Sequence, residues 1–334
     1  MKPVRLLWLL VIVALAWSAW WGWSAWRAKA GLEAWLEARR EAGWQAEWDS
    51  VRLRGYPTRL DRTITGLTLA DTEGGWVWSA PFFQILGLSY QPDHLILVWP
   101  GEMSLQTTEQ RIALTGEDLK GSVTFHPGPS REVNSATLVF KGLALNSDAG
   151  WHSAARELRL AARPGAGAAQ YEIALEAIGL RPGGGVVGLA AEAGLAPPEV
   201  ELLKADLEVT FDRPWDRQAV EQARPQPRAV EIREIAGKWG AMELRIAGDL
   251  RMESDGQVSG DVMIKSTNWR EMLDLAQDTG ALPEALHGTV EAVLNLLSGL
   301  TGRADTLDIP LTFADGRTRI GPVPVGPAPV LRLP

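Results

Sequence analysis

Four histidines are the residues best suited to binding a metal ion or transferring a proton, but they stand far apart in the sequence. His94, His126, His152 and His287 include no pair at i, i+2 or i, i+4, the spacings at which two imidazoles reach one ion. The chain has no cysteine, which excludes disulfides, thiolate catalysis and cysteine-ligated zinc or iron–sulfur sites. The spacing therefore predicts structural or surface histidines and no metal site.

The remaining motifs point to no reaction. GGGVVG at 183–188 satisfies G-x-G-x-x-G, but it follows an Arg-Pro pair and lacks the strand, tight turn and helix of a pyrophosphate site, so we expect a loop. Ser79 has no base in a recognised motif, and Asp61 and Asp212 stand near arginines, as solvated ion pairs do. We expect no catalytic residue and no cofactor; an enzyme would need polar residues that converge from distant strands.

A different chemistry, the binding of apolar molecules, is indicated by Gly75 to Pro100, GWVWSAPFFQILGLSYQPDHLILVWP. This stretch carries one formal charge, Asp93, and both faces of its strands are apolar, whereas a sheet with one solvated face alternates. The turn chemistry of YQPDH at 90–94 predicts two strands, at 82–89 and 95–99. These strands should not cross a membrane, because a lipid-embedded hairpin would leave edge backbone groups unpaired.

Two hypotheses differ in what covers the apolar side chains of these strands. If the protein binds or shields a lipid, the candidate residues should line an open groove; if it is a scaffold or adaptor for a protein partner, they should be packed by protein. The candidate groove residues are Phe82, Phe83, Ile85, Leu86 and Leu88.

The composition of the chain limits the classes of molecule that it can bind. With 334 residues, 46% of them apolar, the chain can bury a core of one large domain or two ordinary ones. A net charge of −8 argues against a surface that binds phosphate backbones, so we expect no nucleic acid.

A membrane anchor is predicted at 6–26, LLWLLVIVALAWSAWWGWSAW, which is long enough to cross about 30 Å of hydrocarbon without a charge. Lys2 and Arg5 precede it, which favours a cytoplasmic end at 1–5 and an ectodomain on the other side. The alternative is a signal peptide cleaved after ALA at 14–16 or WSA at 17–19. The anchor residues that we single out are Leu6, Trp8, Trp17, Trp20, Trp21, Trp23 and Trp26.

An amphipathic juxtamembrane helix is expected at 27–48, and from about residue 49 the apolar period changes from 3.6 to 2. LEVTF at 207–211, MELRI at 242–246 and LDIPLTF at 307–313 alternate as half-buried strands do. The sequence thus predicts a mainly β protein with a few helices, in which the anchor precedes an extended, curved antiparallel sheet.

The β-structure is divided by composition. A first β-region at 49–210 is followed by a proline- and charge-rich linker or long loop at 211–231 and by a second β-region at 232–334. Two helices within 268–300, broken at 279–283, should cap the sheet before closing strands at 306–313 and 318–332.

Two segments of the chain have similar sequences, which we call the internal echo. GLTLADTEGGWVWSA, from Gly66, resembles GLALNSDAGWHSA, from Gly142, and either a true repeat or a meandering sheet that reuses its turns explains the likeness.

Four phrases carry a resemblance to a known family: RGYPTRLD at 54–61, WSAPFFQILGLSYQPDHLILVWP at 78–100, KWGAMELRIAGDLRMESDGQVSGDVMIKSTNW at 238–269 and PLTFADGRTRIGPVPVGPAP at 310–329. They resemble an uncharacterised family of alphaproteobacterial envelope proteins with one N-terminal anchor (domain of unknown function 2125). Gly-Asp-Leu followed by a strand and Asp-Gly-x-x-x-Gly is more distantly similar to AsmA-like envelope proteins, whose β-sheets are thought to carry lipid. The resemblance implies a single-pass protein of the bacterial inner membrane with most of its chain in the periplasm, and it carries over no site residue.

Overall fold

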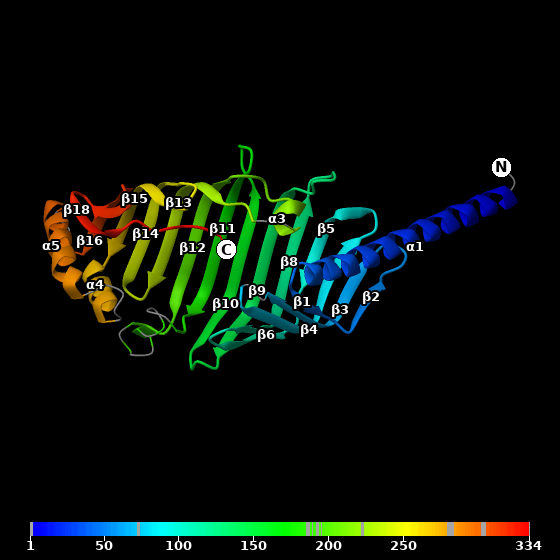
Figure 1. Cartoon of the computed structure of the whole chain (residues 1–334), viewed down its shortest axis with the longest axis horizontal. Helices are drawn as coiled ribbons and strands as arrows, with labels where there is room; N and C mark the ends of the chain where they lie inside the picture. The colour runs from blue at the N-terminus through cyan, green and yellow to red at the C-terminus, as the bar shows by residue number, and fades with distance from the viewer. Residues whose placement is uncertain are drawn as a thin grey trace. The chain divides into compact units, whose positions relative to one another are not determined.

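A computed structural model describes residues 3–71, 74–184, 188, 190–191, 194, 196–221, 224–278, 284–301 and 305–333. The predicted fold class is confirmed: one long N-terminal helix precedes eighteen strands, counted over these described residues, and every strand pairing is antiparallel (Figure 1). The chain divides into two compact units. The first unit comprises Met1–Thr124 with Ser147–Ala149, and the second comprises Phe125–Asn146 with Gly150–Pro334.

The first unit combines the helix with short and long strands. Strand β3 pairs with β1, β2 and β4; the C-terminal half of β4 pairs with β5 and its N-terminal half with β6, while β7 joins β6 and β8 joins β5. The elements are α1 (Pro3–Glu41), β1 (Gln45–Glu47), β2 (Ser50–Arg54), β3 (Asp61–Asp71), β4 (Trp76–Leu88), β5 (Gln91–Val98), β6 (Glu102–Thr107), β7 (Arg111–Thr115) and β8 (Asp118–Phe125).

Helix α1 ends earlier than the expected boundary at residue 48. Gly43 adopts φ +88°, and its N–H donates to Arg40 O while Trp44 N–H donates to Arg39 O, both at 3.0 Å. This pair of bonds is the glycine-terminated cap that satisfies the last carbonyls of a helix. The helix therefore stops at Glu41, and residues 45–47 of the expected juxtamembrane helix form strand β1 instead.

The C-terminal part of α1 packs on the sheet of the first unit. Leu36 is 1% exposed and forms a core with Val51, Ile64 and Leu67. Residues at three- and four-residue spacing in the helix, Leu32 and Trp35, add to this core. The amphipathic pattern of this part of the helix is thus explained by its contact with the sheet.

Strands β4 and β5 are the two strands predicted in the apolar stretch. They pair as Ile85 with Leu97 and Leu86 with Ile96. The turn between them lies at 89–90, earlier than the expected 90–94, because Gln91 already pairs with Leu88 across a register shift.

The second unit is built almost entirely of hairpins, because from β9 to β18 each strand pairs with the next one in the sequence. Its strands are β9 (Val133–Ser147), β10 (His152–Pro164), β11 (Gln170–Arg181), β12 (Val200–Phe211), β13 (Pro227–Trp239), β14 (Met242–Met252), β15 (Val258–Thr267), β16 (Thr306–Ala314), β17 (Arg317–Ile320) and β18 (Val323–Pro327). Its helices are α3 (Arg217–Glu221), α4 (Trp269–Asp278) and α5 (Glu284–Thr301).

The two predicted helices of 268–300 are present as α4 and α5. Trp269 and Leu273 of α4 and Val290 and Leu294 of α5 bury themselves against Leu307 of β16. The expected break at 279–283 lies outside the described residues. The expected strand at 318–332 is divided into β17 and β18, with a turn whose Gly321 adopts φ +56°.

The segment 211–231, expected to be a linker or a long loop, is a connection inside the second unit. Strands β12 and β13 pair directly with each other from Leu202 with Lys238 to Phe211 with Pro227, so the segment only joins their adjacent ends. The division between the compact units falls near residues 124–150 instead. Proline and charge in this segment therefore mark a long hairpin loop that contains α3.

The internal echo corresponds to two similar hairpins, one in each unit. Gly66 in β3 and Gly142 in β9 adopt φ +59° and +60°, the left-handed region that favours glycine. Each strand then turns back into a partner strand that starts at or just after a tryptophan, Trp76 for β4 and Trp151 for β10. The shared phrase therefore specifies a hairpin with a glycine inside its first strand.

Candidate functional site: an apolar sheet face in the second unit

Side chains of opposite character occupy the two faces of the sheet in the second unit. Successive residues of a strand point to opposite faces, and residues directly opposite in neighbouring strands share a face. In β11, for example, Ile173 and Leu175 alternate with Glu172 and Glu176. The register carries this alternation from one strand to the next.

One cross-strand row shows the result most clearly. Each residue in it is directly opposite the next: Leu138, Leu160, Leu175, Ala205, Ile235, Ile246, Ile264 and Ile309, from β9 to β16. Neighbouring strands lie about 4.8 Å apart, so the seven steps make an apolar row about 34 Å long. All eight side chains are half-buried, and none is fully covered by protein.

Two further rows run beside this one, and we call the three rows together the apolar face. On one side stand Phe140, Leu158, Ala177, Leu203, Gly237 and Leu244; on the other stand Ala136, Ala162, Ile173, Leu207, Ile232, Gly248 and Val262. The three rows contain no charged residue. A bulge at Arg233 in β13 keeps Ile232 and Ile235 on this face, although three positions separate them.

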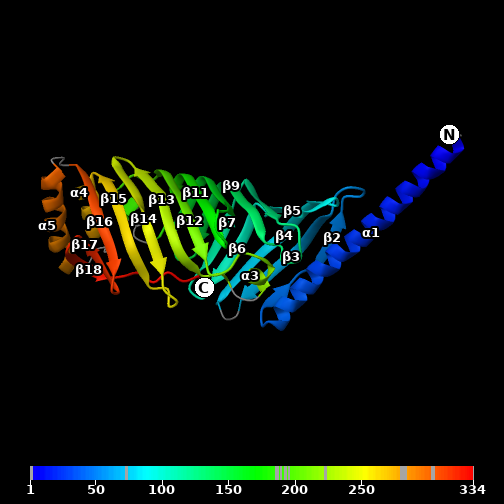
Figure 2. The same ribbon diagram turned by 90° about the horizontal axis from the view of Figure 1, so that it is seen from above.

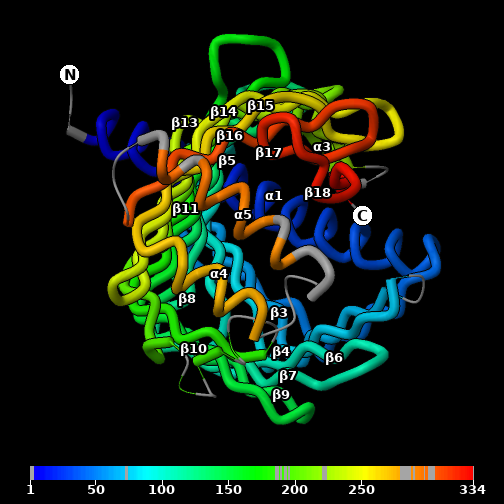
Figure 3. The backbone as a smooth tube through the Cα atoms, turned by 90° about the vertical axis from the view of Figure 1, so that its left-hand side faces the viewer, coloured from blue at the N-terminus to red at the C-terminus, as the bar shows by residue number. Residues whose placement is uncertain are grey.

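The apolar face is covered at its margins. At one margin Trp215 and Leu333 pack on Tyr171 and Val209, and at the β16 end α4 and α5 cover Leu307. In Figure 3 the strands β9 to β15 follow an arc, and α5 lies on its inner side. Since α5 packs on the apolar face, that face is the inner, concave one.

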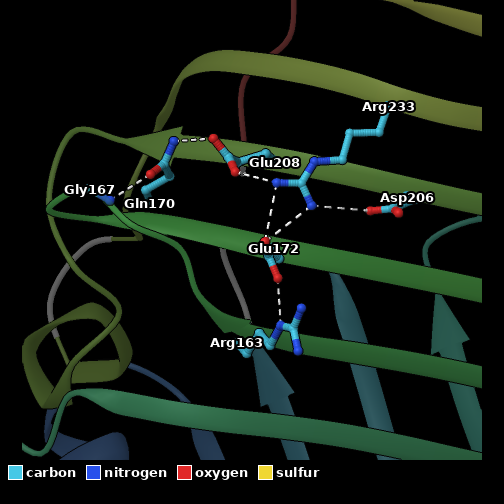
Figure 4. Close-up of polar contacts among 7 residues, drawn as sticks. All are labelled: Arg163, Gly167, Gln170, Glu172, Asp206, Glu208 and Arg233. Atoms are coloured by element: carbon cyan, nitrogen blue, oxygen red, sulfur yellow. Dashed lines mark hydrogen bonds and ion pairs between the residues drawn. The ribbon is translucent and has the colours of Figure 1, made fainter.

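The opposite face, which we call the charged face, carries a network of ion pairs (Figure 4). Arg163 Nε contacts Glu172 Oε2 at 2.5 Å, and Arg233 bridges Glu172 at 3.1 Å and Glu208 at 2.5 Å. Gln170 Nε2 donates to Glu208, which extends the network to the β10–β11 turn. Two hollows that are open to solvent include residues of this face: Arg163, Glu172, Asp206 and Arg233 line one, and Glu243, Arg245, Lys265 and Asp308 line the other.

The electrostatics of this network are those of solvated pairs. Hydrogen bonds from Arg163 and then Arg233 lower the pKa of the Glu172 carboxyl, and the bond to Glu172 raises the pKa of Arg233. Lys204 lowers the pKa of Glu234 in the same way. Both carboxyl groups are therefore held in the ionised form. A general acid or base must instead change its protonation state near neutral pH.

The comparisons with known proteins agree with the span of the sequence resemblance. The model of one family, described as an uncharacterized protein conserved in bacteria (DUF2125), matches residues 21–329. The chain belongs to DUF2125. The comparison with curated proteins finds no match, and neither does the comparison with solved structures.

In this DUF2125 protein the five predicted groove residues do not share one face. By register Phe83 and Ile85 lie on the face of Ile64, whereas Phe82 and Leu86 lie on the other face, and Leu88 follows a register shift. All five are half-buried. Phe83 packs on the core beneath α1 and contacts the rings of Trp78 and Trp99, at 6.1 and 5.4 Å between centroids, so part of the apolarity of this stretch serves the core.

The predicted anchor residues all lie on α1, which is long and apolar enough to cross a membrane. Leu6, Trp8, Trp23 and Trp26 are at least 50% exposed, as expected for side chains that face lipid. Trp17 and Trp21 differ from the others, because their indoles donate hydrogen bonds to the protein itself.

The four histidines remain separate. His94 Nε2 lies 2.9 Å from Ser122 Oγ, and His152 Nδ1 lies 2.9 Å from Asn146 Oδ1, which are structural contacts. Among the described residues no three histidine or acidic side chains gather in a group that could hold a metal ion.

The apolar face itself was missed at the sequence level. Its signal is present as alternation in β9 to β15, for instance LVFKGL at 138–143 and LLKADLEV at 202–209. Each strand alone predicts only a half-buried sheet. Its continuity over many strands depends on the register, which neighbouring turns and the bulge at Arg233 determine.

Proposed function

We propose that this protein is a membrane-anchored envelope protein that binds or shields a lipid, or a similar amphiphile, along the apolar face of its second unit. The observation that supports this function is the row from Leu138 to Ile309, whose half-buried side chains are directly opposed over eight strands. The protein acts as a carrier or shield and performs no covalent chemistry.

The physical reason is the cost of leaving such a face in water. Exposed apolar surface is unfavourable by about 25 cal/mol per Å², and contiguous patches beyond a few hundred Å² mark binding sites. The charged face provides the solvated side of the same sheet, so the apolar face is the side that needs a partner.

The chemistry of the face favours an acyl chain over a protein surface. Within its three rows no side chain offers a charge, and the main-chain groups of the strands are already paired in the sheet. A protein partner brings polar backbone that must find hydrogen bonds when it is buried. An acyl chain has no polar group along its length and loses nothing there.

The length and apolarity of α1 support a site of action at a membrane. In our proposal α1 crosses the bacterial inner membrane uncleaved, with residues 1–5 in the cytoplasm and the remaining chain in the periplasm. Lys2 and Arg5 before the apolar segment support this orientation. A lipid-binding sheet of the AsmA-like kind, attached to the membrane, would serve envelope biogenesis.

Site-specific photo-cross-linking in cells that produce the full chain tests this proposal. A photoreactive phenylalanine analogue replaces Leu160, on the apolar face, or Ala161, the next residue of β10, which is exposed on the charged face. We expect a lipid-mass adduct at position 160, detected by intact mass spectrometry, and none at position 161. Leu175 and Ala174 of β11 form a second matched pair.

Two outcomes would overturn the proposal. Cross-links from positions 160 and 175 to one protein, without lipid, would make this face the docking surface of a scaffold or adaptor. Equal lipid labelling at 160 and 161 would reflect general contact with the bilayer, because the two residues differ only in the face to which they point.

A further inference from the structure

A second membrane contact is indicated in the first unit, where the loop 55–60 between β2 and β3 lies against the anchor helix. Trp17 Nε1 donates to Pro57 O at 2.9 Å, and Trp21 Nε1 donates to Arg59 O at 3.0 Å. The hydroxyl of Tyr56 lies 2.8 Å from Ser18 Oγ, and its ring contacts that of Trp21. The loop therefore lies beside residues 17–21 of the apolar segment, where the end of β2 approaches α1 (Figure 2).

The length of the helix gives this contact its meaning. The apolar segment 6–26 rises about 31 Å and matches the hydrocarbon thickness of about 30 Å. The part that precedes the loop contacts, 6–16, rises only about 16 Å. If the bilayer met only residues 6–16, it would be mismatched by about half its thickness, which is unfavourable at every ångström. The hydrocarbon must therefore extend along the helix to the residues that the loop contacts. Residues 6–21, up to the last of these contacts, rise about 24 Å, which a bilayer accommodates with a small mismatch, so the loop lies near the bilayer surface.

A second turn lies at the same end of the sheet. Ser89 donates to Thr58 O from its N–H at 2.8 Å and from its hydroxyl at 3.0 Å. This places the β4–β5 turn beside the loop. Tyr56 and Tyr90, one on each turn, are both 60% exposed. Tyrosine is enriched at membrane–water interfaces, because its ring prefers the apolar side and its hydroxyl the wet side.

Charge complements this arrangement. Arg52 and Arg54 of β2 and Arg59 of the loop are exposed, and no acidic residue occurs between 50 and 60. Arg59 pairs with Asp61 at 2.8 Å at the edge of this group. Guanidinium groups form paired hydrogen bonds with phosphate, and basic residues next to a membrane span attract anionic lipid.

We propose that the end of the first unit formed by 55–60 and 89–90, which we call the tyrosine end, is embedded in the headgroup layer of the bilayer, with Arg52, Arg54 and Arg59 on anionic lipid phosphates. The inference rests on the membrane anchoring in the proposed function, but not on the apolar face of the second unit. Strand β4 then leads away from the bilayer, so that Trp76 stands about 40 Å from the tyrosine end.

Single-cysteine labelling tests the inference, because the natural chain has no cysteine. A polarity-sensitive fluorophore is attached to Tyr56→Cys, Tyr90→Cys, Glu109→Cys and Leu10→Cys variants of the full chain in vesicles of phosphatidylcholine and phosphatidylglycerol. Glu109 is the aqueous control, since it is exposed in the β6–β7 turn beside the far end of β4. Leu10, 59% exposed on α1, is the membrane control.

We expect blue-shifted emission at positions 56 and 90, with quenching by lipids that carry a nitroxide at the headgroup, and water-like emission at 109. Water-like emission at 56 and 90 with a buried label at 10 would overturn the inference and leave the anchor intact. Water-like emission at 10 as well would overturn both the inference and the anchor. Each labelled variant must keep the circular dichroism spectrum of the parent.

The arginines are tested separately from the tyrosines. In the Tyr56→Cys background, Arg52→Gln with Arg54→Gln should weaken headgroup quenching in vesicles that contain phosphatidylglycerol and should have little effect in pure phosphatidylcholine. An equal effect in both vesicles would show that the arginines hold the loop in shape and do not bind lipid phosphate.

Discussion

At the scale of single residues, the ion pairs of the charged face keep one side of the sheet hydrated. Arg233 sits at the bulge of β13, so its guanidinium reaches Glu172 of β11 and Glu208 of β12 at once. Both partners retain contact with solvent, and isolated pairs of this kind contribute little to stability. The pairs therefore matter mainly for register and solubility.

Glu172 provides a test with a defined pH dependence. Its pKa is lowered by the hydrogen bonds from Arg163 and Arg233, so its contribution to folding stability is fully present above the ordinary value near 4.5. The contribution is lost as the pH falls through the lowered pKa of the folded state. We expect Glu172→Gln to lower Tm at pH 7 by a small amount that disappears in acid, as measured by thermal denaturation from pH 3 to 7.

Glu231→Gln is the matched control for this experiment. Glu231 is exposed and is directly opposite Glu208, but makes none of the contacts described for Glu172. If both variants lose stability with the same pH profile, the network does not stabilise the register and the effect reflects net charge alone.

At the scale of single residues, the predicted anchor residues all lie on α1, whereas the predicted groove residues do not share one face. The stretch 82–88 is apolar without alternation, which predicted a groove, yet the structure divides its residues between two faces. The strands of the second unit alternate, and their apolar residues together form one face. Composition within a segment is visible in a sequence, whereas addition across strands depends on register.

At the scale of elements, the end of α1 shows how one residue determines a boundary. Amphipathic spacing continues to Trp48, which predicted a helix to that point. Gly43 ends the helix because its left-handed conformation allows the two capping bonds to Arg39 and Arg40. The strand β1 that follows then pairs with β3.

Two glycines of this region should respond to alanine in opposite directions. Gly43→Ala places a Cβ at φ +88° and should destabilise the first unit by about 1 kcal/mol. Gly31→Ala, inside α1, meets no atom within 4 Å and should stabilise it by about 1 kcal/mol. Chemical denaturation of the full chain in detergent, followed by tryptophan fluorescence, measures both. Unchanged stability in Gly43→Ala, with the expected gain in Gly31→Ala, would mean that the left-handed cap does not limit the helix end.

At the scale of the whole molecule, the sequence predicted the fold class well because its strongest signals are long. The anchor, the change of period near residue 49 and the two helices near the end each extend over many residues. The composition of the proline-rich segment 211–231 fits a linker or a long loop equally well, and the structure shows a loop that connects two paired strands of one unit. Contacts, which the composition of a loop does not reveal, decide where a unit ends.

Our proposal that the anchor stays uncleaved predicts how the entire chain behaves in cells. We expect the protein to resist extraction from membranes by alkaline carbonate and to keep the mass of the full sequence. A C-terminal alkaline phosphatase fusion should be active, and a C-terminal green fluorescent protein fusion exported as an unfolded chain should be dark. A soluble product that begins after residue 16 or 19 would contradict the anchor and support the signal peptide.

The neighbour-to-neighbour pairing of β10 to β17 has a consequence for how such proteins can vary in evolution. In the described part of the chain, each of these strands pairs only with the strands before and after it, so a hairpin can be inserted or lost without a new long-range pairing. One added hairpin would lengthen the apolar face by about 10 Å. Duplication of a single turn and its two strands would therefore change the length of the amphiphile that the proposed site accommodates.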